Sequence, residues 1–359
     1  MSSASTKVLL TKCSLLAPES ITGIADANDY LGDIEFLDDI EGSFLDKWTF
    51  RGDPLDIVKL RYRAAGSAGK VMIISAFSEA HNMYVDFAVK VVESDPDDED
   101  VDPLDEISVI KHYSHILPCP AIIPIRVTGG QVIMPMAHGD LYNKKFSPSV
   151  ANQIVLVVGR ALMCLYSNDA YYFDIKPMNI MYQCVDGQQA NIFLADLGSV
   201  VLTEGNYKAT YPPPRYIDGM LNPMYTDTDA LYIYSYQLSI LYMMLVDPYV
   251  TVHMPVFSTN GPEKYIQQME LTLALMKGHN PKSPYTQIVQ AMLAGPASRQ
   301  TFGRADEINK RMMARALDYD SAQEELDNIH SLEACGIPEL PDLLRAIEAG
   351  DADLRPYKK

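Results

Sequence analysis

The chain has 359 residues, of which 48% are hydrophobic, which is enough to bury a sizeable core and excludes wholesale disorder. Its formal net charge of −18 at pH 7 argues against general binding to nucleic acid or to anionic membranes, because both repel an acidic surface. We therefore expect no nucleic-acid partner, and a basic protein partner or substrate is easier to accommodate.

The cysteines and the most apolar stretch bear on location. The five cysteines are widely spaced and include no Cys-x-x-Cys pair, which predicts reduced thiols in an intracellular protein, cytoplasmic or nuclear, of a host cell if the source is viral. We expect no export signal near the N-terminus. Residues 230–246 are strongly apolar but fall short of about twenty residues, so we expect a buried helix and no membrane span.

The first part of the chain is predicted to be rich in strands. Residues 1–54 show no chemical motif, and we interpret them as an extension that packs on, or caps, the rest of the chain. Apolar runs at 57–60, 71–74 and 87–92 predict an antiparallel meander. An acidic run at 94–105 comes next, and it is either a solvated loop or a docking site for a basic partner.

The rest of the chain is predicted to be mainly helical. An amphipathic helix is expected over 104–116, followed by two strands over 121–127 and 131–136. From Ser149 onward helical patterns dominate, and strands and loops interrupt them over about 174–214. We therefore predict an α+β fold, with a small antiparallel β-rich part that contains one main helix and a larger helical part.

Small residues between the first two predicted strands form a candidate phosphate site. In the segment Ala64-Ala65-Gly66-Ser67-Ala68-Gly69-Lys70-Val71, backbone N–H groups could close over phosphates, because no large side chain holds the strands away. The same Gly-x-x-Gly spacing is common in ordinary hairpin turns, so the pattern by itself leaves both interpretations open.

A lysine in an apolar strand is a second candidate. Lys90 follows Ala88 and Val89, and a lysine in such surroundings is costly to bury unless a carboxylate pairs with it. Glu106, on the next predicted helix, could supply that carboxylate and aim the ammonium at phosphate oxygens. The alternative is an edge-strand lysine that reaches solvent.

Two polar loops, at 174–180 and 194–198, form the strongest candidate. Phosphoryl transfer needs a base near the attacking hydroxyl, a cation near the transferred phosphate and oxygen ligands for magnesium. The two loops contain Asp174 as the base, Lys176 as the cation, and Asn179 and Asp196 as metal ligands. The alternative is a pair of loops that merely cap helices.

Taken together, these segments resemble the eukaryotic-type serine/threonine protein kinase family, over about residues 56–316 and with a divergent pattern. In that family a Gly-rich loop, a strand lysine, a helix glutamate, an Asp-x-Lys-Pro-x-Asn loop and an Asp-Phe-Gly loop occur in this order. The resemblance implies a bilobal fold and transfer of the γ-phosphoryl group of Mg-ATP to serine or threonine hydroxyls of proteins. The implied catalytic residues are Asp174, Lys176, Lys90 and Glu106.

The resemblance also implies which residues hold ATP and Mg²⁺. Residues 132–141 resemble the segment that joins the two lobes, with Met134 as gatekeeper and adenine on the backbone of Pro135 and Ala137. The implied metal ligands are Asn179 and Asp196. The implied nucleotide-binding residues are Ala64, Gly66, Ser67, Gly69, Val71, Ala88, Lys90, Met134, Pro135, Ala137, Asp140, Asn179 and Asp196.

Departures from the family pattern bear on regulation and substrate binding. Tyr172 and Phe173 replace the usual His-Arg before the catalytic aspartate, and Phe173 cannot pair with a phosphate, which predicts activity without activation-loop phosphorylation. The family's central buried helix normally carries an aspartate, for which Asp227 and Asp229 are candidates. Residues 213–215 (Pro-Pro-Arg) stand in place of Ala-Pro-Glu.

These changes motivate an alternative hypothesis, a pseudokinase that acts as a nucleotide-binding scaffold or regulator. A third hypothesis is a small-molecule kinase of related fold.

Four parts follow from this pattern: an N-terminal extension (1–54), a β-rich lobe (55–136), a helical lobe (137–316) and a C-terminal tail (317–359). Two tail helices are predicted, over 321–332 and 341–349, and we expect them to pack on the helical lobe. Partner contacts through either terminal part are the alternative. The enzymatic hypothesis requires Lys90 and Asp196 to lie together beside a cavity.

Overall fold

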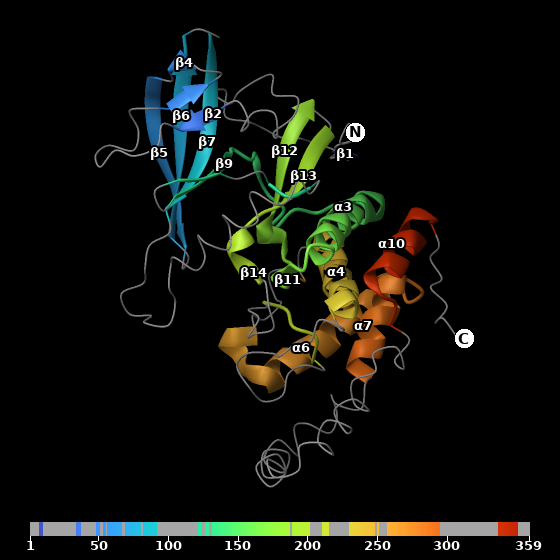
Figure 1. Cartoon of the computed structure of the whole chain (residues 1–359). Coiled ribbons are helices and arrows are strands. Elements are labelled where there is room, and N and C mark those ends of the chain that lie inside the picture. Colours follow the sequence, from blue (N-terminus) through green and yellow to red (C-terminus); the bar gives the residue numbers. More distant parts are fainter. Residues whose placement is uncertain are drawn as a thin grey trace. The chain divides into compact units, whose positions relative to one another are not determined.

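The structure, a computed structural model, describes two compact units of the chain (Figure 1). Unit 1 comprises Met1–Asp140 and Ile180–Gly198, and unit 2 comprises Leu141–Asn179 and Ser199–Lys359. The described residues are 7–9, 34–36, 48–50, 53–54, 56–66, 69–79, 82–91, 121–123, 126–128, 131–186, 189–201, 210–214, 230–247, 250, 257–294 and 337–350.

Unit 1 contains a five-stranded antiparallel sheet in the order β5-β6-β7-β9-β8, whose long strands are blue to cyan in Figure 1. Its strands are β5 (Asp56–Gly66), β6 (Gly69–Ser78), β7 (Met83–Val91), β8 (Arg126–Thr128) and β9 (Gln131–Pro135). The predicted antiparallel meander over the first three strands is confirmed.

Alternation along β7 and β9 gives this sheet two different faces. Phe87, Val89 and Ile133 have no exposed area and form the core side. The residues between them, Ala88 and Lys90, point to the opposite face, because successive side chains of a strand alternate. A polar lysine is therefore carried on a strand whose other face is fully buried.

A second sheet of unit 1 has the strand order β1-β13-β12-β10. Its strands are β1 (Lys7–Leu9), β10 (Gly139–Asp140), β12 (Ile180–Asp186) and β13 (Gln189–Leu194). β12 and β13 form a hairpin, and β1 pairs antiparallel with the outer side of β13. A three-stranded sheet of β2 (Ile34–Phe36), β3 (Trp48–Phe50) and β4 (Asp53–Pro54) also belongs to this unit. Residues 1–54 therefore contain strands that the sequence pattern did not predict.

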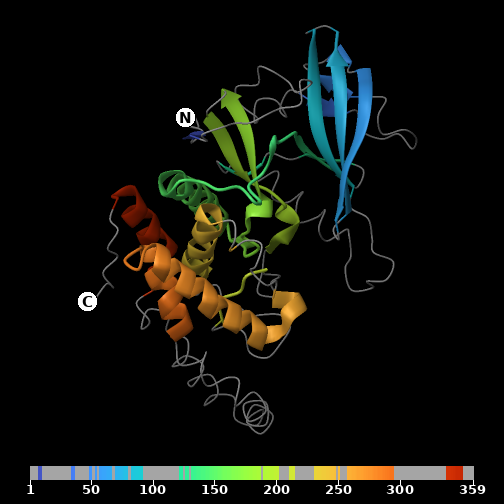
Figure 2. The same cartoon turned by 180° about the vertical axis from the view of Figure 1, so that it is seen from behind.

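Unit 2 is built around one buried helix, α4 (Ala230–Val246), in which 13 residues are buried. It packs against α3 (Pro148–Tyr166), α7 (Pro284–Ala294) and α10 (Leu340–Glu348), and Figures 1 and 2 show it among these helices. A helix that is apolar on all sides belongs in a core. The predicted buried helix over 230–246 is confirmed. A further helix, α6 (Phe257–His279), packs on α7.

The helix α3 begins at a regular N-cap, where the Ser147 hydroxyl accepts a hydrogen bond of 3.4 Å from the Val150 N–H. Among the described helices it alone has the length and composition of a membrane span. However, 56% of its apolar window is buried inside the protein. Packing on α4 and α10 accounts for its apolar character.

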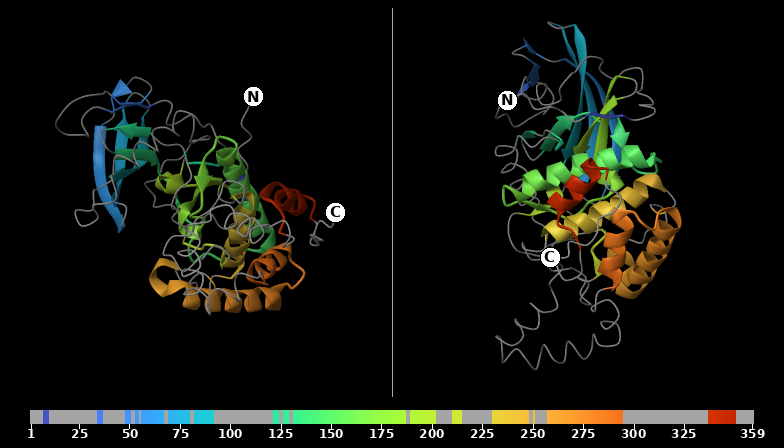
Figure 3. Two further views of the ribbon diagram at one scale, coloured as in Figure 1. Left: turned by 60° about the horizontal axis from the view of Figure 1, so that its bottom comes forward. Right: turned by 90° about the vertical axis from the view of Figure 1, so that its right-hand side faces the viewer.

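The C-terminal helix α10 lies against α3 within unit 2, as the right-hand view of Figure 3 shows in red and green. Gly159 permits the close approach, because a Cβ there would lie 2.5 Å from Leu344 Cδ2. Arg160 and Glu348 form an exposed ion pair of 2.6 Å at the same contact. The helix predicted over 341–349 is confirmed, and the one predicted over 321–332 lies outside the described residues.

Two expectations need correction. The strand predicted over 121–127 is present only as β8, because residues 121–123 bond to the end of β13 instead: Leu194 donates to the Ala121 carbonyl (2.7 Å) and accepts from Ile123 N–H (3.0 Å).

Cys164 and Cys184 are disulfide-bonded, so the prediction of reduced thiols is wrong for these two; distance along the chain did not indicate their proximity to another sulfur. The fold is mixed, with helices and small antiparallel sheets, as expected for the α+β class.

Candidate functional site: a lysine pocket and an aspartate loop

The first part of the candidate site is an ion pair in unit 1. Lys90 Nζ lies 3.2 Å from Asp196 Oδ1, although 106 positions separate the two residues in the sequence. The lysine side chain is only 12% exposed and the aspartate side chain 36%. Burial of a lysine requires such a carboxylate, as its apolar sequence surroundings predict. Asp196 is a carboxylate partner of Lys90 among the described residues, and the predicted partner Glu106 lies outside them.

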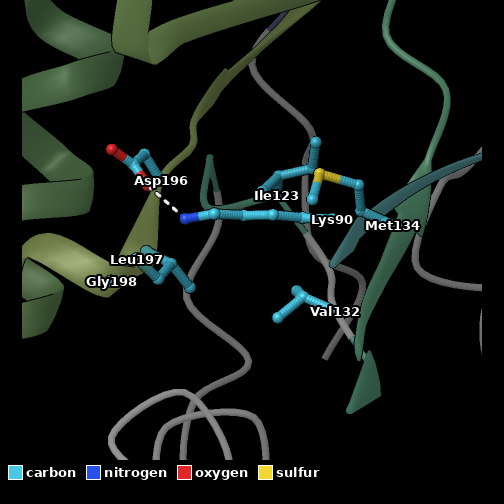
Figure 4. A pocket seen from close by; sticks show the side chains of 7 residues that line it. All are labelled: Lys90, Ile123, Val132, Met134, Asp196, Leu197 and Gly198. Carbon is cyan, nitrogen blue, oxygen red and sulfur yellow. Dashed lines mark hydrogen bonds and ion pairs between the residues drawn. The ribbon is translucent and has the colours of Figure 1, made fainter. Parts of the chain in front are cut away.

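Strand register explains the walls of the pocket beside this pair. Lys90 of β7 lies directly opposite Val132 of β9, and Ala88 lies opposite Met134, so all four side chains share one sheet face. Figure 4 shows the extended Lys90 side chain between Val132 and Met134, with its ammonium at Asp196. The pocket is small, and the empty volume of about 270 Å³ around these side chains includes open solvent. Its lining residues are Lys90, Ile123, Val132, Met134, Asp196, Leu197 and Gly198.

Asp196 holds an unusual backbone conformation. Its φ is +59°, in the left-handed region that few residues other than glycine adopt, although aspartate tolerates it better than most. The short 3₁₀ turn η2 (Leu197–Ser199) follows at once. Left-handed non-glycine residues often occur at functional sites. The turn directs the carboxylate back toward Lys90.

The Gly-rich segment forms the tip of the β5–β6 hairpin. Ala64 and Gly66 are in β5, Gly69 and Val71 are in β6, and Gly66 pairs with Gly69. Ser67 lies outside the described residues. Val71 pairs in turn with Lys90. This register puts the hairpin tip a few residues from the lysine along the same sheet.

The segment after β9 contains the residues assigned to adenine and ribose. Pro135 is the last residue of β9, and Ala137 and Asp140 are half-buried. His138 donates its backbone N–H to the Tyr182 carbonyl (2.8 Å), and its Nδ1 accepts from the Cys184 N–H (2.6 Å). Burial lowers the pKa of His138, which favours the neutral ring that can accept this bond.

The second part of the site is the loop around Asp174 in unit 2. The Asp174 side chain is 9% exposed, and its carboxylate accepts four hydrogen bonds. Thr210 donates to Oδ1 through its N–H (3.1 Å) and its hydroxyl (2.5 Å). Lys176 Nζ (2.6 Å) and Asn179 Nδ2 (3.1 Å) donate to Oδ2. Four donors match the acceptor capacity of an ionised carboxylate.

The Asn179 carboxamide has a defined orientation. Its Nδ2 donates to the Asp174 carbonyl (3.0 Å) as well as to the Asp174 carboxylate and the Tyr172 hydroxyl. A backbone carbonyl can only accept, so the nitrogen must face it and Oδ1 must face the other way. Among the described residues, no donor bonds to that oxygen.

The helix α4 holds the two residues before Asp174. The Tyr172 N–H donates to the Tyr234 hydroxyl (3.1 Å), and Gln237 Nε2 donates to the Phe173 carbonyl (2.5 Å). The rings of Phe173 and Tyr234 stack with centroids 5.3 Å apart. The aspartates expected at this helix, Asp227 and Asp229, lie outside the described residues. A tyrosine and a glutamine make contacts to the loop backbone in the described part of the helix.

The segment that carries Thr210 is anchored by α6. Tyr265 donates its hydroxyl to the Pro212 carbonyl at 2.8 Å. Tyr211 is buried beside Asp174, and burial, together with the negative charge of Asp174, raises the pKa of its hydroxyl to about 12. This phenol therefore stays neutral at physiological pH. Three prolines follow, so this stretch offers no N–H groups at 212–214.

Oxygen ligands for a divalent cation are present in both units. Within the described part of the chain no group of three or more His, Cys, Asp or Glu side chains could hold a metal. The candidates are the Asp196 carboxylate in unit 1 and the outward Oδ1 of Asn179 in unit 2. Both are oxygens, which Mg²⁺ prefers, and Mg²⁺ commonly takes few protein ligands because it retains water and phosphate oxygens.

Comparison with known proteins gives one segmental likeness. No model of a known protein family matches the chain. The chain is 29% identical over 125 residues to ribosomal protein S6 kinase alpha-6 of Mus musculus, a match that covers 32% of this chain and 15% of that kinase. It indicates a relationship to protein kinases. The chain thus spans well under two thirds of that relative.

Several residues of the site were not identified from the sequence. Ile123 and Val132 are ordinary apolar residues whose role depends on register, and Thr210 is far along the chain from Asp174. Tyr234 and Gln237, two of several polar positions in a largely apolar helix, were a usable signal, because a buried polar group needs a hydrogen-bond partner.

Proposed function

We propose that the chain is a protein kinase that transfers the γ-phosphoryl group of Mg-ATP to serine or threonine hydroxyls of protein substrates, on a bilobal kinase-like fold. The observation that carries the proposal is the contact between Lys90 and Asp196 at one apolar pocket. These two residues are the ones to which the sequence pattern assigns phosphate and metal binding. The segmental likeness to a ribosomal S6 kinase supports the same class.

In this proposal, unit 1 binds the nucleotide. The apolar side chains of Val132 and Met134 suit a flat aromatic base, and Lys90 suits phosphate oxygens. The N–H of Ala137 has no hydrogen-bond partner among the described residues and could donate to adenine, while the Pro135 carbonyl could accept. Asp140 would bind the ribose. The hairpin tip (Ala64, Gly66, Ser67, Gly69 and Val71) and Ala88 would cover the phosphates and base.

Unit 2 supplies the groups that act on the acceptor. Asp174 would accept the hydroxyl proton, and its neighbours hold it in one orientation. Lys176 would offset charge that develops on the transferred phosphoryl group. The Thr210 hydroxyl bonds to Asp174 Oδ1, and a substrate hydroxyl has the same chemistry, so an acceptor could replace this contact. Glu106 would pair with Lys90 in the catalytic state.

Asn179 and Asp196 would hold Mg²⁺, whose chemistry is to neutralise phosphate charge. The outward Oδ1 of Asn179 fits this role, because its amide nitrogen is already committed to Asp174 and Tyr172. Lysine two residues after the base favours serine and threonine over tyrosine, by resemblance to the family. The net charge of −18 favours substrates with basic residues near the acceptor.

The test is phosphoryl transfer from labelled Mg-ATP to a generic basic protein, with Asp174→Asn beside the wild type. Loss of the base should reduce transfer by about 10²–10⁴-fold, while nucleotide affinity stays within about twofold, because Asp174 contacts the acceptor and not ATP. If the wild type binds ATP but transfers nothing to any protein, the pseudokinase alternative replaces this proposal. Equal transfer by Asp174→Asn would mean that the activity comes from elsewhere.

A further inference from the structure

The inference concerns Tyr172, a residue that the proposed mechanism does not use. Its side chain has no exposed area, and its hydroxyl accepts a 2.8 Å hydrogen bond from Asn179 Nδ2. A phenol fully removed from water needs a polar partner, and here that partner is the one amide in the catalytic loop. The contact is shorter than the two that Asn179 makes to Asp174, at 3.0 and 3.1 Å.

The three acceptors around Asn179 Nδ2 share two hydrogens. One N–H points to the Tyr172 hydroxyl, and the other is shared by the carbonyl and carboxylate oxygens of Asp174. Without the hydroxyl, the amide would keep partners on one side only and could rotate about its terminal bond. The Asp174 carbonyl sets which side Nδ2 faces, and the Tyr172 hydroxyl holds the plane of the carboxamide, which sets the direction of Oδ1.

Tyr172 is itself held in place from α4. Its backbone N–H donates to the Tyr234 hydroxyl. The carbonyl of the following residue, Phe173, accepts a hydrogen bond from Gln237 Nε2. Tyr234 and Gln237 are 0% and 1% exposed. Two buried side chains on one rigid helix thus fix the peptide group before Tyr172 and the peptide group after Phe173.

We propose that Tyr172 is a positioning residue: its hydroxyl orients the Asn179 carboxamide so that Oδ1 faces the metal and Nδ2 faces Asp174, and Tyr234 and Gln237 of α4 hold Tyr172. The inference rests on the proposed function, because it gives Asn179 the role of a metal ligand. Outer groups that orient a ligand commonly change metal affinity 10–100-fold when they are removed.

The first measurement needs no metal and no activity. In Tyr172→Phe the ring is kept and only the hydroxyl is lost. One side-chain N–H of Asn179 then loses its acceptor, so its proton resonance should move upfield and exchange faster in the nuclear magnetic resonance spectrum of the metal-free protein. Tyr166→Phe is the matched control, because the Tyr166 ring packs edge-on against Tyr171 while its hydroxyl is outside this network. An unchanged Asn179 amide signal in Tyr172→Phe overturns the inference.

The second measurement is the affinity for Mn²⁺, followed by electron paramagnetic resonance in the presence of a non-hydrolysable ATP analogue. Tyr172→Phe should weaken it by about tenfold, and Tyr166→Phe should leave it unchanged. Tyr234→Phe, which removes the acceptor of the Tyr172 N–H, should weaken it in the same direction. Equal affinity in wild type and Tyr172→Phe overturns the inference, whatever the transfer assay shows.

Transfer assays separate positioning from the proposed function itself. The deficit of Tyr172→Phe should shrink as Mg²⁺ is raised, because excess metal compensates for a poorly oriented ligand, whereas the deficit of Asp174→Asn should persist. A Tyr172→Phe deficit that is independent of Mg²⁺ contradicts the positioning role. A wild type with neither transfer nor nucleotide-dependent Mn²⁺ binding overturns the proposed function and, with it, the metal role of this network, even if the amide signal shifts.

Discussion

The pocket around Lys90 and the loop around Asp174 are organised in opposite ways. Lys90 and Asp196 meet through one 3.2 Å contact beside an open apolar pocket, and Asp196 is 36% exposed. Asp174, by contrast, is 7% exposed as a residue and accepts four hydrogen bonds from side chains and backbone. The pocket has a charge pair that a ligand can rearrange, whereas the loop is fixed before any ligand arrives.

This difference matters because catalysis depends on groups that are oriented in advance, while binding can use groups that move onto the ligand. In the loop, donors from Lys176, Asn179 and Thr210 already hold the carboxylate in the folded protein. In the pocket, Lys90 can exchange one anion for another, since phosphate oxygens and a carboxylate attract the same ammonium.

Replacing the lysine would test the pocket with the largest expected effect. Lys90→Met keeps most of the apolar stem and removes the charge, so phosphoryl transfer should fall by about 10²-fold, with loss of nucleotide affinity contributing to the deficit. Titration with an ATP analogue and steady-state kinetics would measure both. Lys277→Met, at an exposed position of α6, is the control for loss of one positive charge. If both variants behave alike, Lys90 does not contact the nucleotide.

Alanine substitutions at Gly159 and Gly278 test the packing of α10 on α3. At Gly159 an added Cβ would lie 2.5 Å from Leu344 Cδ2 and 3.3 Å from Leu238 Cδ1, whereas at Gly278 it would meet nothing within 4 Å. Both sites are helical, so alanine gains about 1 kcal/mol of helix propensity at each. Overpacking should offset this at Gly159 and leave its free energy of unfolding about 1–3 kcal/mol below that of Gly278→Ala.

Urea unfolding would measure this difference between the two alanine variants. Adding Leu344→Val to Gly159→Ala should recover part of the loss, because it shortens the side chain that the new methyl group meets. Equal free energies of unfolding for Gly159→Ala and Gly278→Ala would mean that α10 does not pack on α3 as described.

A smaller effect is expected from the protonation of His138, measured as the pH dependence of stability. Burial lowers the pKa of His138, so the unfolded chain, in which histidine titrates near about 6.5, binds the proton more readily than the folded chain. The contribution to stability is therefore complete above about pH 6.5 and is lost as pH falls through the folded pKa. Unfolding measured across this range should show a shallower slope in His138→Gln. An unchanged slope would contradict the assignment of a neutral, hydrogen-bonded ring.

For phosphatase treatment we expect no change in activity. Phe173 stands at the position where the family that this chain resembles has a phosphate-binding arginine. Its ring stacks on Tyr171 and Tyr234 inside unit 2. A buried aromatic ring cannot bind a phosphate, so treatment with a phosphatase should leave the transfer rate unchanged. Loss of activity after treatment, restored by rephosphorylation within residues 202–215, would contradict this prediction.

The sequence predicted the parts of the molecule that depend on local pattern. The meander over β5 to β7 and the helix α4 follow from periodic apolar residues, and the chemistry of Asp174, Lys176 and Asn179 follows from residue types at short spacing. Contacts that depend on pairing register could not be predicted in this way. Val132 faces Lys90 only because β7 and β9 pair at that register, and Asp196 reaches Lys90 through a left-handed turn.

The polar groups of α4 show why other contacts could not be predicted. The family pattern predicts an acidic side chain at this helix, whereas Tyr234 and Gln237 lie within a strongly apolar run. Their role depends on which peptide groups face them, and these belong to residues 172 and 173, more than sixty positions earlier. A buried polar side chain in an apolar helix indicates that a partner exists, and it does not indicate which one.

The pairing of β1 with β13 has a practical consequence for handling the protein. Because Lys7–Leu9 forms the outer strand of its sheet, recombinant chains that begin after residue 9 would leave the main-chain groups of β13 exposed along that edge. Unprotected edges recruit strands from other molecules, so such truncated preparations should self-associate as their concentration rises. Affinity tags are therefore better separated from Met1 by a soluble spacer, and residues 1–9 are best retained.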